Sequence, residues 1–449
     1  MGNAKLNKIN RVSQLFRSIH VTLPNTFEKT ELSKGYVNMI NNGIIKSVNK
    51  GMHVLLPLGL RVLNKLTALI DKEMINIGAQ KILLPSLTSI KLLEKTNRYE
   101  SDKNELFRLT DRYKKEYILS PTFEEAICNL IHNLGPLSSK ILPLKLYQIS
   151  SKWRDEMKPR LGLLRSREFI MKDLYTFNVN LDDAKDTYNI ICEAYDKIFN
   201  QIGIEYIKAI GDTGSIGGCL SHEYQYLSEI GEDVILSCQS CNYYVNKNVS
   251  KQTECPRCSK KLQAHNTIEV GHTFLLDTKY SKPLNAFYIN KNIEKPLVMG
   301  CFGIGLSRIM AAAVEILSVK EELRWPKSLA PFTVCIIPPK EGSKEEAASS
   351  YIEQIYNILC KLGIDAILDD RTDLTIGKRL LYVRNIGYPY AIILGKSVIS
   401  KSTFELYDVY NNKYHDVTLE GLSDYFMNNY IRESDNIMNN DIRESVKRN

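Results

Sequence analysis

A proline-flanked apolar segment at 325–340, "WPKSLAPFTVCIIPPK", divides the chain into two parts with different secondary-structure patterns. After this segment, strand-like runs alternate with amphipathic helical stretches, which predicts a small α/β domain over residues 331–427. Before it, strand-like runs cluster without regular intervening helices. That clustering predicts an α+β domain with a mainly antiparallel sheet over residues 35–330. Residues 428–449 are polar, and we expect them to form a frayed helix or a disordered tail.

Local patterns predict several elements of the first part. Residues 51–80 predict a turn and an amphipathic helix that stops at Gly78, followed by a short strand, "KILLP". The stretch "EYILSPTFEEAICNLIHNL" reads as strand, loop and helix, with Thr122 as the expected N-cap and Glu125 as its capping-box partner. Residues 181–202 predict one long helix.

Length and charge limit the classes of protein to which the chain can belong. Its 449 residues are enough for roughly two to four domains. The formal net charge of +8 is compatible with a polyanionic partner but does not require one, since many soluble proteins are mildly basic. No apolar run reaches the length of a membrane span, so we expect no membrane segment.

The first 27 residues have the composition of a targeting segment. They carry scattered lysines and arginines and no acidic residue before Glu28. In "KINRVSQLFRSIH" the apolar residues recur at roughly helical spacing with basic residues between them. This pattern predicts a mitochondrial presequence over residues 1–27, and therefore a protein of the mitochondrial matrix. A disordered basic tail is the alternative.

Four of the ten cysteines form two closely spaced pairs, Cys238-x-x-Cys241 and Cys255-x-x-Cys258, with thirteen residues between them. The other six are scattered, which argues against a disulfide framework and for a reducing compartment. Paired cysteines at this spacing suit a tetrahedral Zn²⁺ site in a ribbon-like insert over residues 236–262. A set of thiols without metal is the alternative.

A long, strongly basic hairpin is expected at 147–177, "YQISSKWRDEMKPRLGLLRSREFIMKDLYTF". Its first strand ends at Arg154 and Glu156, and the chain returns through Arg165 and Phe169. Several guanidinium groups along one hairpin suggest binding to phosphate or carboxylate, because arginine offers paired donors and is always charged. A solvated hairpin with surface ion pairs fits these residues equally well.

A glycine-rich apolar run follows at 298–310, "VMGCFGIGLSRIM". Its glycine spacing is not that of a dinucleotide-binding turn, and it lacks the lysine and hydroxyl residue of a P-loop. Taken alone, it is as consistent with an ordinary strand, tight turn and helix as with a ligand-binding loop.

Taken together, these segments resemble the three signature motifs of the class II aminoacyl-tRNA synthetases. The basic hairpin resembles motif 2, and the glycine-rich turn that ends at Arg308 resembles motif 3. Residues 51–85, with Gly51 and Pro85, resemble motif 1, the helix and strand that form the dimer interface in this class. The resemblance implies an α+β catalytic domain, with an antiparallel sheet flanked by helices, a C-terminal α/β anticodon-binding domain and a homodimer.

Further blocks resemble the prolyl-tRNA synthetases in particular. "SPTFEEA" is similar to their Thr-x-Glu loop, and "KPRLGLLRSREFIMKD", "DTGSIGG" and "EVGHTFLLDTKYS" are similar to their bacterial and mitochondrial branch. The resemblance extends over about residues 35–427. Only a short segment separates Cys258 from "TIEVGHTF", so the chain is expected to lack the editing insertion of bacterial-type members. We therefore do not expect hydrolysis of mischarged alanyl-tRNA in cis.

The resemblance implies that the chain activates L-proline with ATP and Mg²⁺ and transfers it to the 3′ end of tRNA(Pro). Thr122 and Glu124 would contact the proline nitrogen, because a secondary ammonium needs hydrogen-bond acceptors. Arg154 would bridge the amino-acid carboxylate and the α-phosphate, where charge develops during the reaction. Arg308 would hold the γ-phosphate on the opposite side.

The other expected site residues form two groups. Glu156 would accept a hydrogen bond from the adenine amino group while Phe169 stacks on the ring. The further ATP-binding residues are Arg165 and Glu269, and Glu269 would help hold Mg²⁺. The proline pocket would be lined by Trp153, His272 and Cys301. Cys301 is expected to act as a pocket wall without a catalytic role.

Two further expectations concern nucleic acid. Lys378 and Arg379 are expected on the tRNA-binding face of the C-terminal domain. The rival hypothesis is a non-catalytic class II synthetase-like protein that binds tRNA or another nucleic acid. Such a protein would be expected to lose Arg154, Glu156 or Arg308, and all three are present.

Overall fold

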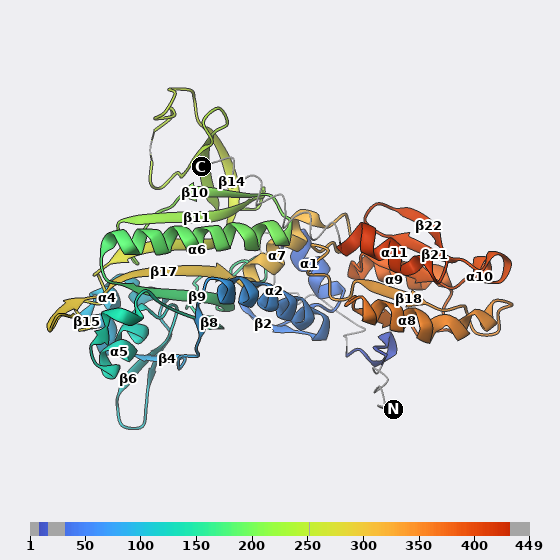
Figure 1. Cartoon of the computed structure of the whole chain (residues 1–449), viewed down its shortest axis with the longest axis horizontal. Coiled ribbons are helices and arrows are strands. Elements are labelled where there is room, and N and C mark those ends of the chain that lie inside the picture. The colour runs from blue at the N-terminus through green and yellow to red at the C-terminus, as the bar shows by residue number, and fades with distance from the viewer. Residues whose placement is uncertain (1–8, 17–31, 251, 432–449) are drawn as a thin grey trace.

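The computed structural model describes residues 9–16, 32–250 and 252–431 of the chain. Figure 1 shows a large lobe built on a long sheet and a smaller lobe formed by the C-terminal part of the chain. Most of the predicted polar tail lies outside the described residues. Within the described ranges, no helix is both long enough and apolar enough to cross a membrane.

A nine-stranded sheet organises the large lobe. Its strands are β3 (Gln80–Lys81), β8 (Leu144–Trp153), β9 (Glu168–Asn178), β10 (Tyr206–Ile210), β11 (Leu220–Leu227), β12 (Asp233–Cys238), β13 (Tyr243–Asn246), β14 (Gln263–Asp277) and β17 (Val298–Gly305). Their order in space is β11-β10-β13-β12-β14-β17-β9-β8-β3, and β11 also pairs directly with β14. The central neighbours β14, β17, β9 and β8 are all antiparallel, whereas β3–β8 and β10–β13 are parallel. The expected α+β fold with a mainly antiparallel sheet is confirmed.

Helix α6 (Leu181–Ile202) covers one face of this sheet and coincides with the helix predicted over 181–202. Its start is capped by the Asn180 side chain, whose oxygen accepts a hydrogen bond from the Asp183 amide at 2.9 Å. Its end is Gly203, which adopts the left-handed conformation that commonly terminates helices. The strong local caps explain why this helix could be predicted.

The packing of α6 assigns each face of the central strands to a different role. Phe302 on β17 faces the helix, because its ring lies 5.5 Å from that of Tyr188. Successive side chains of a strand point to opposite faces, so Cys301 and the Gly303 position lie on the other side. We call that side, on β8, β9, β14 and β17, the site face. Figure 1 shows α6 lying along the sheet, and the site is therefore on the face that α6 leaves open.

Three other helices surround the sheet and join the lobes: α1 (Lys34–Asn41), α2 (Pro57–Asn76) and α7 (Leu306–Leu317). On α2, Arg61 and Lys65 reach across to Asp365 of the C-terminal lobe. Arg61 Nη2 lies 2.7 Å and Lys65 Nζ lies 3.0 Å from the same Asp365 oxygen. The Arg61 guanidinium also lies 3.9 Å from the centre of the Phe332 ring. These contacts, together with a buried apolar core that is continuous across both lobes, tie the two parts together.

The predicted strand "KILLP" after α2 is largely wrong. Only Gln80 and Lys81 pair with β8, and the following residues leave the sheet. Leu83 is among the most exposed large apolar side chains of the described chain, with 76% of its surface accessible. An apolar run therefore did not mark a buried strand here.

The smaller lobe is a five-stranded mixed sheet covered by helices. Its strands are β18 (Val334–Ile337), β19 (Ala366–Leu368), β20 (Tyr390–Ile393), β21 (Phe404–Asp408) and β22 (Lys413–Val417). Its helices are α8 (Ile352–Lys361), α9 (Ile376–Ile386), α10 (Lys396–Lys401) and α11 (Gly421–Phe426). The first three strands of the order β19-β18-β20-β21-β22 are parallel, which confirms the expected α/β class. Arg379 is buried and donates to the Asp369 carbonyl, so its expected place on an exposed RNA-binding face is wrong, whereas Lys378 is exposed.

Short elements at one end of the large lobe carry the predicted Thr-x-Glu loop. They are α3 (Ile90–Lys95), α4 (Arg98–Asp102), α5 (Glu124–Leu134), β4 (Leu87–Ser89), β5 (Arg108–Thr110), β6 (Glu116–Leu119), β7 (Leu137–Ser138), β15 (Phe287–Asn290) and β16 (Ile293–Pro296), whereas the hairpin of β1 (Ile45–Asn49) and β2 (Met52–Leu55) packs beside α1 and α2. The predicted N-cap role of Thr122 is wrong. Phe123 occupies the N-cap position of α5, and no side chain caps the helix there. The Thr122 hydroxyl instead accepts a hydrogen bond from Arg98, a partner that no local rule indicates.

The described part of the predicted presequence, residues 9–16, contacts the smaller lobe. It forms a parallel bridge to the edge strand β19, in which the Leu368 amide donates to the Asn10 carbonyl at 2.9 Å. The Ser13 amide and hydroxyl both donate to Asp370, at 3.0 and 2.6 Å. Val12 is buried, with 1% of its surface exposed. This segment thus covers the edge of the sheet as a strand neighbour would.

Candidate active site

An open cleft on the site face gathers the residues expected to bind ATP. Its lining includes Arg154, Glu156, Arg165, Phe169, Glu269, His272 and Arg308. These residues come from the end of β8, the loop after it, and strands β9 and β14 and helix α7, so antiparallel pairing brings distant segments together. All six predicted ATP-binding residues line this one cleft.

The glycine-rich run forms part of the cleft wall and floor. Gly303 and Gly305 line the cleft at the end of β17. A side chain at Gly303 would project into the space beside Met171, since the nearest atom to an added Cβ is the Met171 sulfur at 3.5 Å. Gly305 is the N-cap of α7, and Arg308 is the third residue of that helix. The run is therefore both a ligand-facing surface and a strand-to-helix turn.

Two arginines supply positive charge to the cleft and are held differently. The Arg308 side chain donates to the carbonyls of Leu164 and Glu269, at 3.2 and 2.9 Å. The Arg154 guanidinium lies over the Phe169 ring, 5.3 Å from its centre. It makes no hydrogen bond or ion pair with another residue of the described ranges. Desolvation and the charge of Arg308 lower the pKa of Arg154, as expected for a cation that awaits an anionic partner.

Glu269 is an ionised carboxylate between these cations. Burial alone would raise the pKa of Glu269, but neighbouring His272 and Arg308 outweigh burial and lower it to about 2. His272 is fixed on both ring nitrogens, with Nδ1 3.1 Å from Glu269 Oε1 and Nε2 2.6 Å from Ser221 Oγ. Its ring also stacks on Phe274 at a centroid distance of 3.9 Å. His272 is therefore held in a fixed orientation and forms part of the wall of the cleft.

The loop between β8 and β9 is organised by a residue that the sequence did not indicate. Glu232 forms ion pairs with Arg160 and Arg165, each with an N···O distance of 2.6 Å. Arg165 also pairs with Glu156 at 3.0 Å. Burial alone would raise the pKa of Glu156, but its hydrogen bond with Arg165 lowers it. Glu232 thus positions two of the arginines of the basic hairpin, which are not simply solvated.

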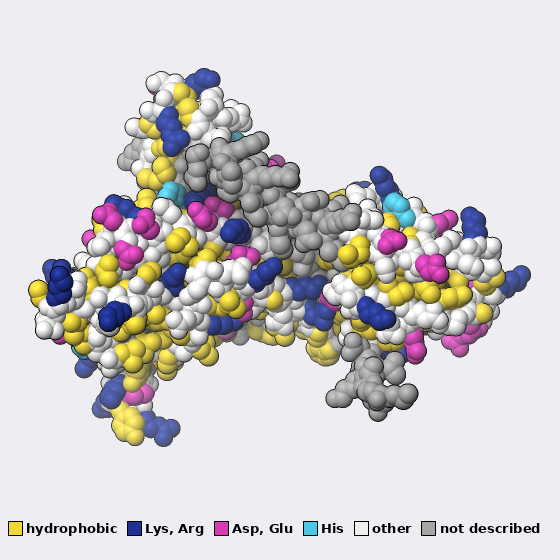
Figure 2. Space-filling view, viewed as in Figure 1, with side chains coloured by type: hydrophobic (Ala, Val, Ile, Leu, Met, Phe, Trp, Pro, Cys, Tyr) yellow, Lys and Arg dark blue, Asp and Glu magenta, His cyan; other side chains and the backbone are white. Residues whose placement is uncertain are grey.

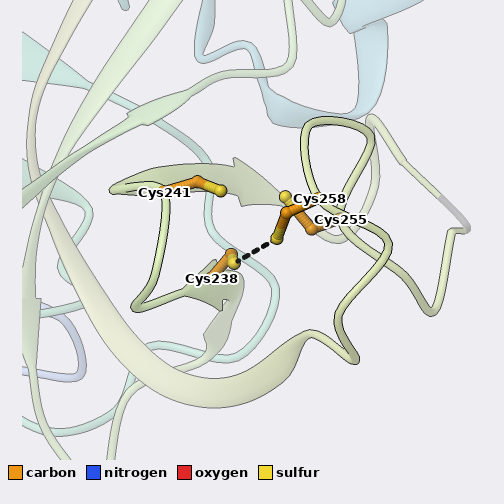
Figure 3. Close-up of side chains that lie close together, drawn as sticks. All are labelled: Cys238, Cys241, Cys255 and Cys258. Carbon is orange, nitrogen blue, oxygen red and sulfur yellow. Dashed lines mark hydrogen bonds between the residues drawn. The ribbon is translucent and has the colours of Figure 1, made fainter.

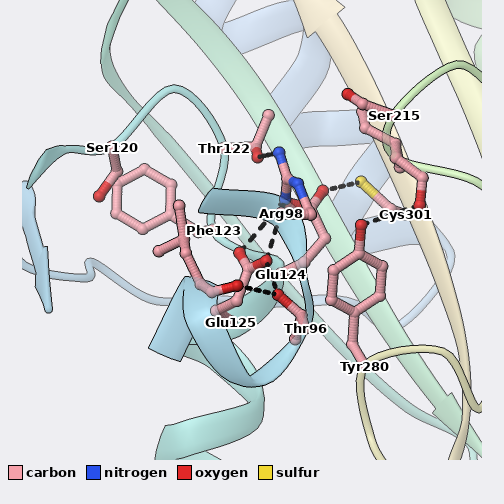
Figure 4. A network of polar contacts seen from close by, with 12 residues as sticks. Thr96, Arg98, Ser120, Thr122, Phe123, Glu124, Glu125, Ser215, Tyr280 and Cys301 are labelled. Atoms are coloured by element: carbon pink, nitrogen blue, oxygen red, sulfur yellow. Dashed lines mark hydrogen bonds and ion pairs between the residues drawn. The ribbon is translucent and has the colours of Figure 1, made fainter. Parts of the chain in front are cut away.

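A second, buried cluster lies around Arg98 on α4, beside the site face (Figure 4). Arg98 Nη2 donates to the Thr122 hydroxyl at 3.0 Å, and Arg98 Nη1 donates to Glu124 Oε2, also at 3.0 Å. The other Glu124 oxygen accepts from the Cys301 thiol at 3.1 Å. Three of the predicted substrate-binding residues, Thr122, Glu124 and Cys301, therefore meet in one network. Arg98, which joins them, was missed by sequence reasoning.

The pKa values of the two adjacent carboxyl groups in this cluster, Glu124 and Glu125, shift in opposite directions. Burial alone would raise the pKa of Glu124, but Arg98 lowers it, so Glu124 is ionised. Burial raises the pKa of Glu125, and the nearby charge of Glu124 adds to that rise despite the pairing with Arg98. Burial and Glu124 also hold the pKa of the Cys301 thiol well above its usual range, which leaves it a protonated donor. This state supports the expectation that Cys301 is not a nucleophile.

A buried ion pair connects the cluster to the sheet. Lys152 Nζ lies 2.6 Å from Asp173 Oδ1, and Asp173 also accepts from Gln148 at 3.0 Å. The Lys152 ammonium lies 4.8 Å from the centre of the Phe123 ring, which belongs to the Thr-x-Glu loop. The loop is therefore packed on a rigid polar centre in the middle of the site face.

Trp153 is placed apart from the other predicted residues. It does not line the cleft and makes no described contact with the Arg98 cluster. Its backbone amide donates to the Ser120 carbonyl at 3.3 Å. The indole N–H is buried without a hydrogen-bond partner among the described residues.

The four paired cysteines converge in the ribbon formed by β12, β13 and the start of β14 (Figure 3). All four sulfur atoms lie within 4.8 Å of one another, and those of Cys238 and Cys258 are 3.6 Å apart. Zn–S bonds of about 2.3 Å in a tetrahedron place sulfur atoms roughly 3.8 Å apart, so the cluster has the right size for zinc. The Arg257 amide also donates to the Cys255 sulfur at 3.4 Å. The ribbon projects from the large lobe with Lys and Arg side chains on its surface (Figure 2).

The two parts of the site suit different parts of a substrate pair. The cleft presents arginines and an aromatic ring, which suit phosphates and a nucleobase. The Arg98 cluster presents an ionised, buried carboxylate and a hydroxyl, which suit a small ammonium. Both parts border strand β17, the cleft through Gly303 and the cluster through Cys301, so they can hold two substrates against each other.

Comparison with known proteins agrees with this chemistry. Residues 107–317 match the family described as tRNA synthetase class II core domain (G, H, P, S and T). Residues 333–429 match the family described as anticodon binding domain.

Individual relatives narrow the family. The chain is 45% identical over 392 residues to a probable mitochondrial proline--tRNA ligase of Mus musculus, covering 86% of this chain and 82% of that protein. It is 36% identical over 385 residues to a proline--tRNA ligase of Ehrlichia chaffeensis, covering 82% and 89% of the two chains.

A solved structure supports the fold. The crystal structure of prolyl-tRNA synthetase from Cryptosporidium parvum with halofuginone and AMPPNP aligns with a TM-score of 0.73. The alignment covers 92% of this chain and 79% of that chain at 18% identity, a level that supports the fold alone. From the sequence relatives and the matched domains, we conclude that the chain belongs to the prolyl-tRNA synthetase family of class II aminoacyl-tRNA synthetases.

Proposed function

We infer that the chain is a proline--tRNA ligase, which activates L-proline with ATP and then transfers the prolyl group to tRNA. One structural observation carries the reaction: a cleft framed by Arg154 and Arg308 lies beside a buried, ionised Glu124. The first can hold a triphosphate and the second an ammonium. The rival hypothesis, a non-catalytic binding protein, does not account for the retention of both arginines in the cleft.

In the activation step, the amino-acid carboxylate attacks the α-phosphorus of ATP and pyrophosphate leaves. Arg154 would contact the carboxylate and the α-phosphate, because its guanidinium has no partner in the described ranges apart from the Phe169 ring. Arg308 would hold the γ-phosphate from the start of α7. These fixed cations would stabilise the charge that develops at phosphorus, and no general base is required.

The adenine would lie between two residues of the loop and strand. Phe169 would stack on the ring, and Glu156 would accept from the exocyclic amino group. Glu156 is already paired with Arg165, so Arg165 would keep this acceptor in place and add positive charge to the ATP site. Glu232 supports that arrangement from the opposite side.

Proline would bind with its ammonium against Thr122 and Glu124. Cys301 would form the wall next to Glu124, and His272 would form the wall toward the cleft. Trp153 would contribute only after a rearrangement at the end of β8, because it lies outside the described cleft. Alanine is smaller than proline, and an apolar pocket rejects a smaller analogue only weakly.

Glu269 would hold the Mg²⁺ that accompanies ATP. It is ionised, it lines the cleft between the two arginines, and carboxylates are preferred Mg²⁺ ligands. When bound, the ion would neutralise phosphate charge. His272 holds the Glu269 carboxyl group in place, and Arg308 holds its backbone carbonyl.

We propose a structural zinc ion at Cys238, Cys241, Cys255 and Cys258. The sulfur positions fit a tetrahedral site, and the ribbon has only a small apolar core of its own. A metal would therefore supply much of the stability of this insert.

The C-terminal lobe would bind the anticodon region of tRNA(Pro), in keeping with its match to anticodon-binding domains. Exposed Lys378 is one candidate contact.

We also propose a homodimer through the segment that resembles motif 1. This segment exposes large apolar side chains to solvent in the single chain: Val54, Leu60, Ile75 and Leu83. Burial of such a surface would be favourable.

We propose that the protein works in the mitochondrial matrix. Several relatives are named as mitochondrial, and the N-terminus is basic and poor in acids. Residues 9–16 contact the smaller lobe, so removal of a leader that ended near residue 27 would also remove this contact.

The reaction is tested by ATP–pyrophosphate exchange with each of the twenty amino acids, using residues 9–449. We expect exchange with proline, weaker exchange with alanine and little with the others. Arg154→Ala and Arg308→Ala should each lower kcat/KM by roughly a hundredfold or more, because a preorganised cation is lost. Arg112→Ala, an exposed arginine on the β5–β6 turn, is the matched control. Folded protein that binds tRNA but shows no exchange would favour the non-catalytic rival.

Zinc is tested by metal analysis of the purified chain, which should contain about one zinc ion per chain. The double variant Cys255→Ser/Cys258→Ser should lose the ion and become sensitive to proteolysis within residues 239–262. Cys219→Ser, at an exposed cysteine outside the cluster, should retain it. Protein without metal, whose ribbon resists proteolysis equally before and after treatment with a chelator, would contradict the proposal.

The dimer is tested by sedimentation velocity on Leu83→Asp. We expect the wild type to sediment as a dimer and this variant to shift toward monomer, since a charge would be buried without a partner. Ile399→Asp, at an exposed apolar position on α10, serves as the control and should remain dimeric. If both variants stay dimeric, the interface lies elsewhere.

The N-terminal segment is tested in two ways. N-terminal sequencing of the protein recovered from mitochondria should find a start at or before Ile9. In hydrogen exchange, deletion of residues 1–16 should speed exchange of the Leu368 amide, which loses its acceptor on Asn10, whereas deletion of residues 1–8 should not. A mature chain that starts after residue 16 would show that the observed contact is not part of the working protein.

A further inference from the structure

We propose that Arg98 is a positioning residue that presents Thr122 and Glu124 to the ammonium of the amino acid and thereby sets the affinity for proline. This inference rests on the proposed function. Arg98 itself does not need to touch the substrate. It acts by fixing the orientation of two acceptors and by compensating the burial of one of them.

The Arg98 guanidinium donates one hydrogen bond to Thr122 and another to Glu124. Arg98 Nη2 bonds the Thr122 hydroxyl, and Nη1 bonds Glu124 Oε2, each at 3.0 Å. Because guanidinium is planar and rigid, these two bonds fix the distance between the hydroxyl and the carboxylate. Each acceptor oxygen has a second lone pair that remains available for a substrate N–H. A lysine ammonium could supply the charge but not this paired geometry.

Further contacts hold Arg98 itself in place. Its Nε lies 3.2 Å from Asp102, and Nη1 also reaches Glu125 at 3.2 Å. Glu125 in turn accepts from the Thr96 hydroxyl at 2.8 Å. Figure 4 shows Arg98 between the loop that carries Thr122 and the start of α5. The arginine is 4% exposed, so it cannot adopt alternative positions in solvent.

Carboxylates outnumber the guanidinium at the centre of the cluster. One guanidinium faces three carboxylates, those of Asp102, Glu124 and Glu125. The other titratable groups that face Glu124 from the surrounding elements are Lys152, Tyr175, Lys279, Tyr280 and Cys301. Of these, Lys152 is already paired with Asp173. The Lys279 ammonium also faces these carboxylates and the pKa of Glu125 is raised, so the attraction for an incoming ammonium comes from the ionised Glu124 carboxylate.

Loss of Arg98 should change both the geometry and the ionisation of Glu124. Arg98 is what holds the pKa of Glu124 below its usual value against the effect of burial. Without it, burial would raise that pKa toward neutrality, so protons would compete with the substrate as the pH falls. The affinity for proline should then weaken from about pH 8 to about pH 6, whereas in the wild type it should stay nearly flat.

The test measures proline and ATP kinetics by pyrophosphate exchange for Arg98→Gln, Arg98→Lys and Arg108→Gln in the otherwise intact chain. For Arg98→Gln we expect the KM for proline to rise by roughly tenfold or more, with smaller changes in kcat and in the KM for ATP. The KM for proline should also become pH-dependent in the direction given above. Arg98→Lys should restore the flat pH profile but only part of the affinity. Arg108 is an exposed arginine on β5, and its variant should match the wild type.

Several outcomes would overturn the inference. One is a wild-type KM for proline in Arg98→Gln. Another is an equal loss of proline and ATP binding without a pH dependence, which would indicate a general structural role. If Arg98→Gln does not fold, Arg98→Lys alone decides, because the proline KM of that variant must still rise at an unchanged melting temperature. A wild-type chain without any proline-dependent exchange would instead refute the proposed function.

Discussion

The alternation of side chains along four antiparallel strands is the constraint on which the rest of the structure depends. One face of β8, β9, β14 and β17 packs on α6, where Phe302 lies against Tyr188. The other face is left for polar groups such as Asp173 and for the ligand cleft. A slip of one residue in any pairing would exchange these faces and place charges in the core. The ladders β17–β9 and β9–β8 are long and uninterrupted, which fixes the register of the residues that line the site.

Electrostatics then separates the two halves of the site. The cleft holds Arg154 and Arg308, and the neighbouring cluster holds an excess of carboxylates around Arg98. The opposite signs suit the two reactants, since ATP is an anion and the amine end of an amino acid is a cation. The carboxylate end of the amino acid would point toward the cleft, where it must react. The field of the protein would thus help to orient a very small substrate that offers few contacts.

Much of this could be predicted where the signals are local. The caps and apolar spacing of residues 181–202 determine a helix, and the cysteine spacing indicates a tetrahedral cluster. Tertiary partners overrode local rules elsewhere. Thr122 looks like an N-cap but bonds Arg98, which lies 24 residues away in sequence. The sequence around Arg98 did not indicate a buried role for this residue. Its partners belong to another segment, and a single arginine among polar residues is typical of a protein surface.

Apolar pattern was likewise an incomplete guide. The run that contains Leu83 is as hydrophobic as a buried strand, yet only its first residues join the sheet. In the proposed dimer a second chain would cover Leu83, and such a residue looks the same in sequence as one that packs within its own chain. Glu232 illustrates the same difficulty for charge. It lies far from the basic hairpin in sequence, and only folding shows that it holds Arg160 and Arg165.

The contacts of Arg61 and Lys65 with Asp365 have a consequence for the choice of RNA. They lock the lobes together, and the apolar core continues between them. The catalytic cleft and the smaller lobe are therefore held at a fixed distance from each other. A tRNA whose anticodon contacts the smaller lobe would deliver its 3′ end to the cleft only if its two arms have the matching length and angle. The fixed spacing of the two lobes would thus contribute to the discrimination between tRNAs, independently of contacts with individual bases.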